Sequence, residues 1–161
     1  MIGTLRQAVR ADVPEIQRVR HAVRENRLTS RVISDAEVLD AIERSGRGWV
    51  VECVAQDAGE GESKGQPVLA GFAIGNPETG NIWALFVDPA FEARGVGRRL
   101  HDEMVAWLWL RGLRRLWLTT EPGTRAQRFY ERAGWRNCGL TPRGNELRFE
   151  LEAPNIRVRP L

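Results

Sequence analysis

Residues 82–100 read IWALFVDPAFEARGVGRRL, and this stretch carries the strongest structural signal in the chain. Its apolar part, Ile82 to Val87, predicts a strand that ends at Asp88-Pro89. Gly95 and Gly97 then lead into a helix, because apolar residues recur at helical spacing after them. Glycine allows close backbone approach, and the first turn of a helix offers unpaired N–H groups and the positive end of the dipole. The stretch therefore predicts a strand, an anion-binding turn and a helix.

The arginines around this turn favour the same interpretation. Arg94, Arg98 and Arg99 crowd the helix start, where a cation costs a few tenths to about 1 kcal/mol against the dipole unless an anion binds there. Two phosphate-binding motifs are absent: the chain has no GxxxxGK[ST], and Leu100 occupies the third glycine position of GxGxxG. A GxG before a helix also suits a tight turn beside a packed helix. Taken alone, the motif leaves the two roles equally open.

Two sequence signatures together narrow the choice. FVDPAFEARGVGRRL resembles the acetyl-coenzyme A loop of the GNAT superfamily of N-acetyltransferases, in which Q/R-x-x-G-x-G/A follows a strand ending in V-x-P. Downstream, LWLTTEPGTRAQRFYERAGW resembles the second signature of that superfamily, a strand and then a helix with A-x-x-x-Y-x-x-x-G-F. Two positions depart from the patterns: Glu92 replaces Gln or Arg, and Gly123 replaces a frequent Asn. The resemblance covers residues 68–135 well.

The resemblance implies direct transfer of an acetyl group from acetyl-CoA to an amine of a small molecule or a protein. It also implies that the strands ending at Val87 and Thr120 splay apart around the pantetheine arm. Leu85 and Val87 would then offer backbone groups to pantetheine and the acetyl carbonyl, with the Val87 N–H as the oxyanion donor. The residues expected to wrap the pyrophosphate are Arg94, Gly95, Val96, Gly97, Arg98 and Arg99.

Tyr130 and Glu121 are the expected catalytic residues. Tyr130 matches the family tyrosine that hydrogen-bonds the departing sulfur, and its reference pKa of about 10 lies near the ~8.5 of a thiol. The same tyrosine could instead be a core aromatic of a capped helix. The amine also needs a base, and the strand 82–87 contains no carboxylate. Glu121 is preferred as base over Glu25 and His21, although each could also be a solvated surface group.

Two other function classes compete with this prediction. A catalytically silent acyl-CoA sensor would keep the loop and lack an effective base. A nucleic-acid binder is suggested by the arginines, which make up all but one of the 24 basic residues. These are dispersed among 21 acidic residues and form no basic stripe, so no nucleic-acid partner is expected. A homodimer through Trp107 or Trp109 is a further hypothesis, because two residues two apart on a helix point in different directions.

Composition sets the outer limits. With 161 residues, 18.2 kDa and 42% hydrophobic residues, we expect a single globular domain over residues 1–161. The longest apolar run, residues 104–110, is far shorter than the ~20 residues of a bilayer crossing, and no secretory signal is evident. We therefore expect a cytoplasmic protein without a membrane partner. Cys53 and Cys138 lack CxxC spacing, so we expect no metal site and two small buried side chains.

Local signals complete the predicted order, β-α-α-β-β-β-α-β-α-β-β, an α/β fold with a mixed sheet covered by helices. Capping pairs predict helix starts at Asp12, Ser34 and Thr124, the first helix running to about Asn26, and the helix after Gly95 ending near Gly112. Gln56 to Gln66 is Gly-rich and predicts a hairpin loop. Apolar runs and alternation predict strands at 4–9, 49–55, 68–74, 82–87, 113–119, 136–140 and 146–152. Trp49, Trp83 and Trp117 lie on these strands, and we expect them in the core.

Overall fold

The computed structural model describes residues 3–23, 32–54 and 67–155. Within these ranges the chain forms seven strands and four α-helices, in the order that the sequence predicts. The predicted loop at 56–66, and Glu25, lie outside the described residues. The strands are β1 (Thr4–Gln7), β2 (Arg47–Val54), β3 (Pro67–Gly75), β4 (Ile82–Val87), β5 (Arg115–Thr120), β6 (Arg136–Leu140) and β7 (Leu147–Glu152). The helices are α1 (Val13–Ala22), α2 (Asp35–Glu43), α3 (Val96–Leu110) and α4 (Arg125–Arg132), with short 3-10 turns at η1 (Arg10–Asp12) and η3 (Pro89–Phe91).

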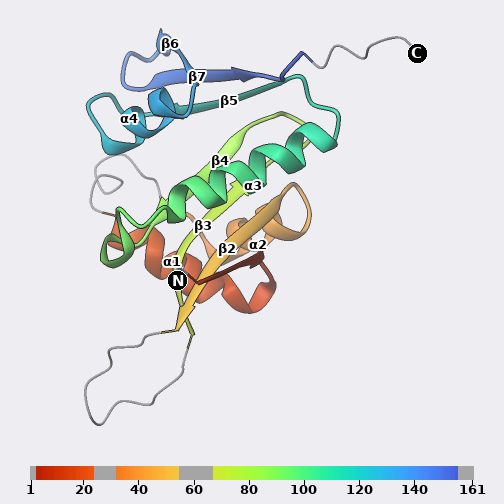
Figure 1. Cartoon of the computed structure of the whole chain (residues 1–161), viewed down its shortest axis with the longest axis vertical. Helices are drawn as coiled ribbons and strands as arrows, with labels where there is room; N and C mark the ends of the chain where they lie inside the picture. The colour runs from red at the N-terminus through yellow and green to blue at the C-terminus, as the bar shows by residue number, and fades with distance from the viewer. Residues whose placement is uncertain (1–2, 24–31, 55–66, 156–161) are drawn as a thin grey trace.

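The strands form two antiparallel sheets rather than one continuous mixed sheet. The first has the order β1-β2-β3-β4 and the second β5-β7-β6. An isolated parallel bridge between Asn81 and Trp117 joins them at the start of β4. Beyond this bridge no further pairing joins β4 to β5 in the described part of the chain, so the splay that the resemblance implies is present (Figure 1).

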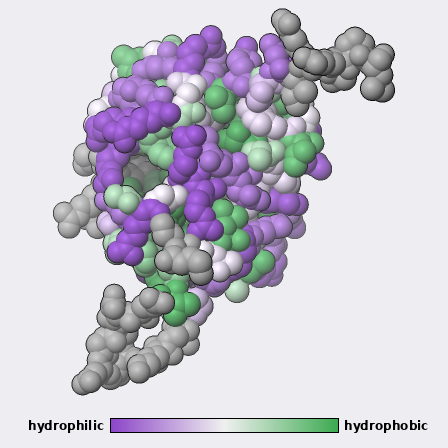
Figure 2. Space-filling model, in the orientation of Figure 1, coloured by the Kyte–Doolittle hydropathy of each residue, from purple (hydrophilic) through white to green (hydrophobic). Residues whose placement is uncertain are grey.

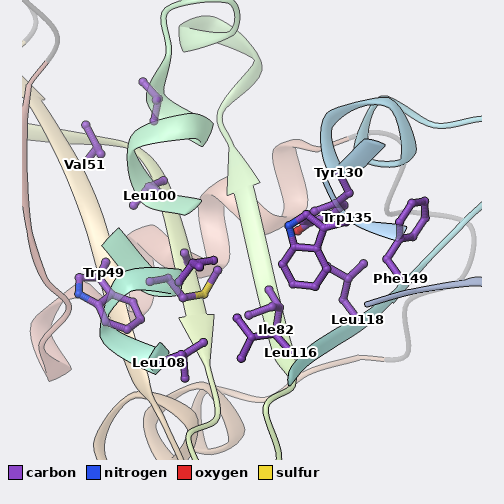
Figure 3. Close-up of a cluster of buried hydrophobic side chains, with 14 of the residues drawn as sticks. Trp49, Val51, Ile82, Leu100, Leu108, Leu116, Leu118, Tyr130, Trp135 and Phe149 are labelled. Carbon is purple, nitrogen blue, oxygen red and sulfur yellow. The ribbon is translucent and has the colours of Figure 1, made fainter. Parts of the chain in front are cut away.

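Helices cover both faces of the first sheet (Figure 1). Helix α3 packs on one face through Leu100, Met104 and Leu108, and its core continues through Leu116, Leu118 and Phe149 of the second sheet. Helices α1 and α2 cover the other face with a separate core that includes Ile16, Val19 and Phe72. Figure 3 shows the first cluster reaching from Trp49 and Leu108 across to Tyr130, Trp135 and Phe149. The α3 core therefore holds the two sheets together on either side of the β4–β5 divergence.

Two of the three predicted caps are confirmed. The hydroxyls of Ser34 and Thr124 accept hydrogen bonds from the N–H groups of Glu37 and Gln127 at 3.2 and 3.3 Å. Asp12 is the N-cap residue of α1, as predicted, but its side chain makes no capping bond to the helix, because its carboxylate instead binds Arg6 and the Val9 N–H. α3 ends, as predicted, just before Gly112, which has a φ of 92°.

Three further predictions need correction. Helix α1 ends at Ala22 rather than near Asn26, because the backbone of Val23 is extended, with a φ of −78° and a ψ of 105°. Trp83 and Trp117 were expected in the core with Trp49, yet both are half-buried. Cys138 is exposed on β6, which lies at the edge of the second sheet, whereas Cys53 is buried as expected.

Candidate functional site

The gap between β4 and β5 presents backbone groups of β4 that β3 does not use. The Asp88 N–H donates to the Ala70 carbonyl of β3 at 2.8 Å. Successive N–H groups along a strand face opposite edges, so the amides of Val87 and Leu85 face away from β3, toward the side where β5 has diverged. Their side chains pack against the α3 core. The structure thus brings both predicted residues to the gap with their amides turned into it.

The turn before α3 has the conformation that its glycines predict. Gly95 is the N-cap of α3 and lies in the left-handed region, with a φ of 79°. A Cβ on Gly97 would lie 3.3 Å from Val87 Cγ2 and 3.6 Å from Phe129 Cε2, so Gly97 marks the point where β4, α3 and α4 meet. The first-turn amides of α3 have no preceding helical carbonyl to bind. Figure 2 shows the surface hollowed on the left of the view, between the loop before α3 and the start of α4, with hydrophilic side chains around the opening.

The three predicted arginines lie at the surface around this turn but point to different partners. Arg94 lies over the Phe91 ring, with its guanidinium carbon 5.6 Å from the ring centroid. Arg98 forms an ion pair with Asp102 at 3.2 Å, one turn along the helix. Arg99 donates to the Gly3 carbonyl at 3.2 Å. All three side chains are exposed and long.

The acidic residue that departs from the family pattern is neutralised. Glu92, in the loop before α3, forms an ion pair with Arg125 at the first position of α4. This pair links the loop before α3 to the first turn of α4. The sequence pattern could not show it, because the two residues are 33 positions apart.

Tyr130 is a core residue of α4, which is one of the two roles that the sequence left open. Only 6% of its surface is exposed, and its ring packs against Phe129, Trp135 and Phe149 (Figure 3). Burial raises the pKa of its hydroxyl above the ordinary value of 10. The hydroxyl therefore remains protonated, and able to donate a hydrogen bond, throughout the physiological range.

Two of the three candidate bases, Glu121 and His21, lie in the described part of the chain. Glu121 directly follows β5 and is half-buried, and its carbonyl accepts a hydrogen bond from the Thr124 hydroxyl at 2.8 Å. This bond fixes the turn in which the Glu121 side chain lies. His21 is exposed near the end of α1. Glu121 thus stays the candidate at the end of the diverging strand.

The core contains a buried imidazole, His101, that was not predicted as a site residue from the sequence. His101 of α3 is 4% exposed and accepts a hydrogen bond from the Trp135 indole at 2.9 Å. Its position could have been found from helical spacing, since His101 lies three residues before Met104 and seven before Leu108 on the buried face. Its partner, 34 residues away, could not.

No helix of the described part is long and apolar enough to cross a membrane. The same residues contain no group of three or more His, Cys, Asp or Glu side chains arranged to hold a metal ion.

Solved structures with the same fold include acetyltransferases. The ribosomal-protein-S18-alanine N-acetyltransferase of Escherichia coli is 20% identical, with 97% of this chain and 98% of that chain covered and a TM-score of 0.61. PaiA N-acetyltransferase of Thermoplasma acidophilum, solved with coenzyme A, is 15% identical over 93% and 98% of the two chains, with a TM-score of 0.73. YncA of Salmonella typhimurium, solved with its cofactor acetyl-CoA, is 18% identical over 94% of each chain, with a TM-score of 0.70.

At 15–20% sequence identity these solved structures show the fold alone, and the family is shown by a family model. No curated protein matches the sequence. The model of the acetyltransferase (GNAT) family matches residues 14–135, which include both signatures, the β4–β5 gap and Tyr130. Acetyl-CoA as acetyl donor agrees with this match and with the ligands of the two solved neighbours. The chain belongs to the acetyltransferase (GNAT) family.

Proposed function

We propose that this protein transfers an acetyl group from acetyl-CoA directly to a primary amine. The observation that carries the proposal is a juxtaposition: the unpaired amides of β4 open into the same gap that the N-terminus of α3 flanks. One end of this arrangement suits a diphosphate and the other suits a polarised carbonyl. A thioester attached to a diphosphate by a long arm matches both ends.

The diphosphate binds at the start of α3 in this proposal. The N–H groups of Val96, Gly97 and Arg98 and the positive end of the helix dipole stabilise its negative charge. Arg94, Arg98 and Arg99 add mobile cations, while Gly95 supplies the left-handed turn. The absence of a side chain at Gly97 leaves the pantetheine arm a path past Val87.

Acetyl transfer needs protein groups at the carbonyl oxygen, the sulfur and the amine nitrogen. The neutral amine nitrogen attacks the thioester carbonyl carbon, forming the C–N bond while the carbonyl oxygen becomes an oxyanion. The Val87 N–H donates to this oxyanion. Collapse of the intermediate breaks the C–S bond, and the Tyr130 hydroxyl donates to the departing sulfur. The proton lost by the nitrogen passes to Glu121, directly or through a water molecule.

The acceptor is an amine, of a small molecule or of a protein. The neighbour from Escherichia coli is a ribosomal-protein-S18-alanine N-acetyltransferase, so the fold can serve acetyl transfer to an amine of a protein. The rival function is a catalytically silent acyl-CoA sensor, favoured by the lack of a carboxylate on β4. Both functions require the cofactor site, and only the enzyme requires Tyr130.

A thiol-release assay separates the two. Wild-type protein is mixed with acetyl-CoA and a panel of amines that includes polyamines, aminoglycosides, free lysine and peptides with free N-termini. The enzyme releases CoA thiol only in the presence of one of these amines, and the product carries one added acetyl group by mass spectrometry. Tight acetyl-CoA binding without acetyl transfer to any member would assign the sensor function instead.

A further inference from the structure

The buried imidazole of His101 is held between two defined partners. Its Nε2 accepts the indole N–H of Trp135 at 2.9 Å, and its Nδ1 lies 2.8 Å from Oδ1 of Asp102. An indole nitrogen can only donate and a carboxylate can only accept. The proton of the neutral ring therefore lies on Nδ1, and Nε2 is the acceptor. These two contacts fix both the tautomer and the ring orientation.

This imidazole contacts the aromatic residues that surround Tyr130. The His101 ring packs edge-on against Phe129 and Trp135, with centroids 5.7 and 6.0 Å away. Both of these rings in turn pack edge-on against Tyr130, with centroid separations of 5.3 and 5.4 Å. His101 on α3 thus supports the two rings that flank Tyr130, from the helix whose first turn forms the proposed diphosphate site.

His101 and Trp135 satisfy each other's hydrogen-bonding groups inside the core. Burying a polar ring is unfavourable unless its nitrogens are hydrogen-bonded, so His101 and Trp135 each depend on the other. An apolar side chain at position 101 could fill the same space, but it would leave the Trp135 N–H buried without a partner.

We propose that His101 is a positioning residue for acetyl transfer, holding Trp135 so that the Tyr130 hydroxyl stays aimed at the departing sulfur. The inference rests on the proposed function. Asp102 extends the connection to the cofactor side, because it contacts both His101 and Arg98, at 2.8 and 3.2 Å. The same helix therefore links a diphosphate-binding arginine to the leaving-group donor.

The proposal has a definite pH consequence. The titratable or charged groups around the ring are Asp102 and Arg98 on α3 and Tyr130 on α4. Burial lowers the pKa of His101, with the Asp102 carboxylate opposing that effect. Protonation would place a hydrogen on Nε2, facing the Trp135 N–H, and would break the contact. We therefore expect kcat to fall as pH decreases through this pKa.

The test compares His101→Phe with His101→Gln. The Gln Oε1 can replace Nε2 as acceptor for the Trp135 N–H, whereas Phe cannot. We expect H101F to lower kcat about tenfold or more while the KM for acetyl-CoA changes less than about twofold, and H101Q to restore most of kcat. The part of the acid limb that arises from His101 should be absent in H101Q. If H101F does not fold, Trp135→Phe removes the same bond from the other side, and it should lower kcat to the same extent.

An activity-independent measurement keeps the two proposals distinguishable. In protein labelled with 15N-tryptophan, the Trp135 indole N–H should resonate downfield in the wild type and H101Q and shift upfield in H101F. Wild-type kcat in H101F, or equal losses in H101F and H101Q, would overturn the positioning role and leave the acetyltransferase proposal intact. A wild type that binds acetyl-CoA and acetylates no amine would overturn the proposed function, and the positioning role with it.

Discussion

Tyr130 is protonated over a wider pH range than an exposed tyrosine because burial raises its pKa above the ordinary value of 10. Replacing it with Phe keeps the ring contacts to Phe129 and Trp135 and removes only the hydroxyl. We expect Tyr130→Phe to lower kcat by about 100-fold, within the range of general acid catalysis, and to leave acetyl-CoA affinity within about twofold. Steady-state kinetics with calorimetry measures both. An unchanged kcat would assign Tyr130 to the core alone.

Glu92 carries a negative charge beside the proposed diphosphate site, and this charge is paired with Arg125. Glu92→Gln removes the repulsion and releases Arg125 from that pairing. We expect acetyl-CoA to bind roughly two- to fivefold more tightly at low ionic strength, with the gain shrinking in salt because exposed charges are screened. Exposed Glu103 of α3 provides the control, since Glu103→Gln changes the net charge equally. Equal effects of the two substitutions would indicate a general charge effect.

At the scale of elements, the N-terminus of α3 is the feature on which cofactor binding depends. Glutamate in the first turn of a helix interacts favourably with the dipole, by about 0.3–1 kcal/mol, so Gly97→Glu should preserve the helix. The same side chain places bulk and negative charge in the diphosphate path. We expect acetyl-CoA affinity to fall at least about 100-fold in calorimetry, with the circular dichroism spectrum retained. Gly97→Ala, whose Cβ lies 3.3 Å from Val87 Cγ2, should have a much smaller effect.

Local sequence signals predicted the elements well and their tertiary partners poorly. The bounds of β4 and β6 agree with the prediction, and the Ser34 and Thr124 caps form, because alternation and capping act within a few residues. The Asp12 side chain makes no capping bond to α1, because its carboxylate binds Arg6 and the Val9 N–H instead. That competition depends on where β1 lies relative to η1, which no local pattern encodes.

At the scale of the whole molecule, the candidate site arises where two sheets diverge. The sequence motifs place the glycine turn and Tyr130, but they predict their meeting only through the resemblance to a family. The contacts that surround them, Glu92 with Arg125 and His101 with Trp135, join residues more than 30 positions apart. Such pairings depend on where α4 and the following Trp135 lie relative to α3 and the loop before it, so they could not be predicted from periodicity or spacing.

The Arg6, Asp12 and Glu52 cluster predicts how stability of the whole fold depends on pH. Arg6 binds Asp12 and Glu52 at 2.8 and 3.2 Å, tying β1 to η1 and β2. Burial acts to raise the pKa of Asp12, but the hydrogen bonds from Arg6 and the Val9 N–H outweigh it and hold the pKa below its ordinary value. This stabilisation is complete above the unfolded-state pKa of about 4 and is lost as pH falls through the lower folded-state pKa.

Asp12→Asn tests that sign. Near neutral pH the substitution should lower the free energy of unfolding by about 2 kcal/mol, because charged hydrogen bonds are replaced by weaker neutral ones. The difference from the wild type should shrink as pH falls below about 4, because Asp12 is then protonated more readily in the unfolded state than in the folded state. Urea titrations near pH 7 and at about pH 3 measure it. A difference that stays constant between the two pH values would show that the Asp12 charge does not stabilise the fold.

A crystal structure with coenzyme A or acetyl-CoA bound is the most direct test of the proposed site. We expect diphosphate oxygens about 3 Å from the amides of residues 96–98, and the sulfur end of pantetheine between β4 and β5 within reach of the Val87 N–H and the Tyr130 hydroxyl. A cofactor bound with its diphosphate away from the α3 N-terminus, or with its thioester outside the β4–β5 gap, would contradict it.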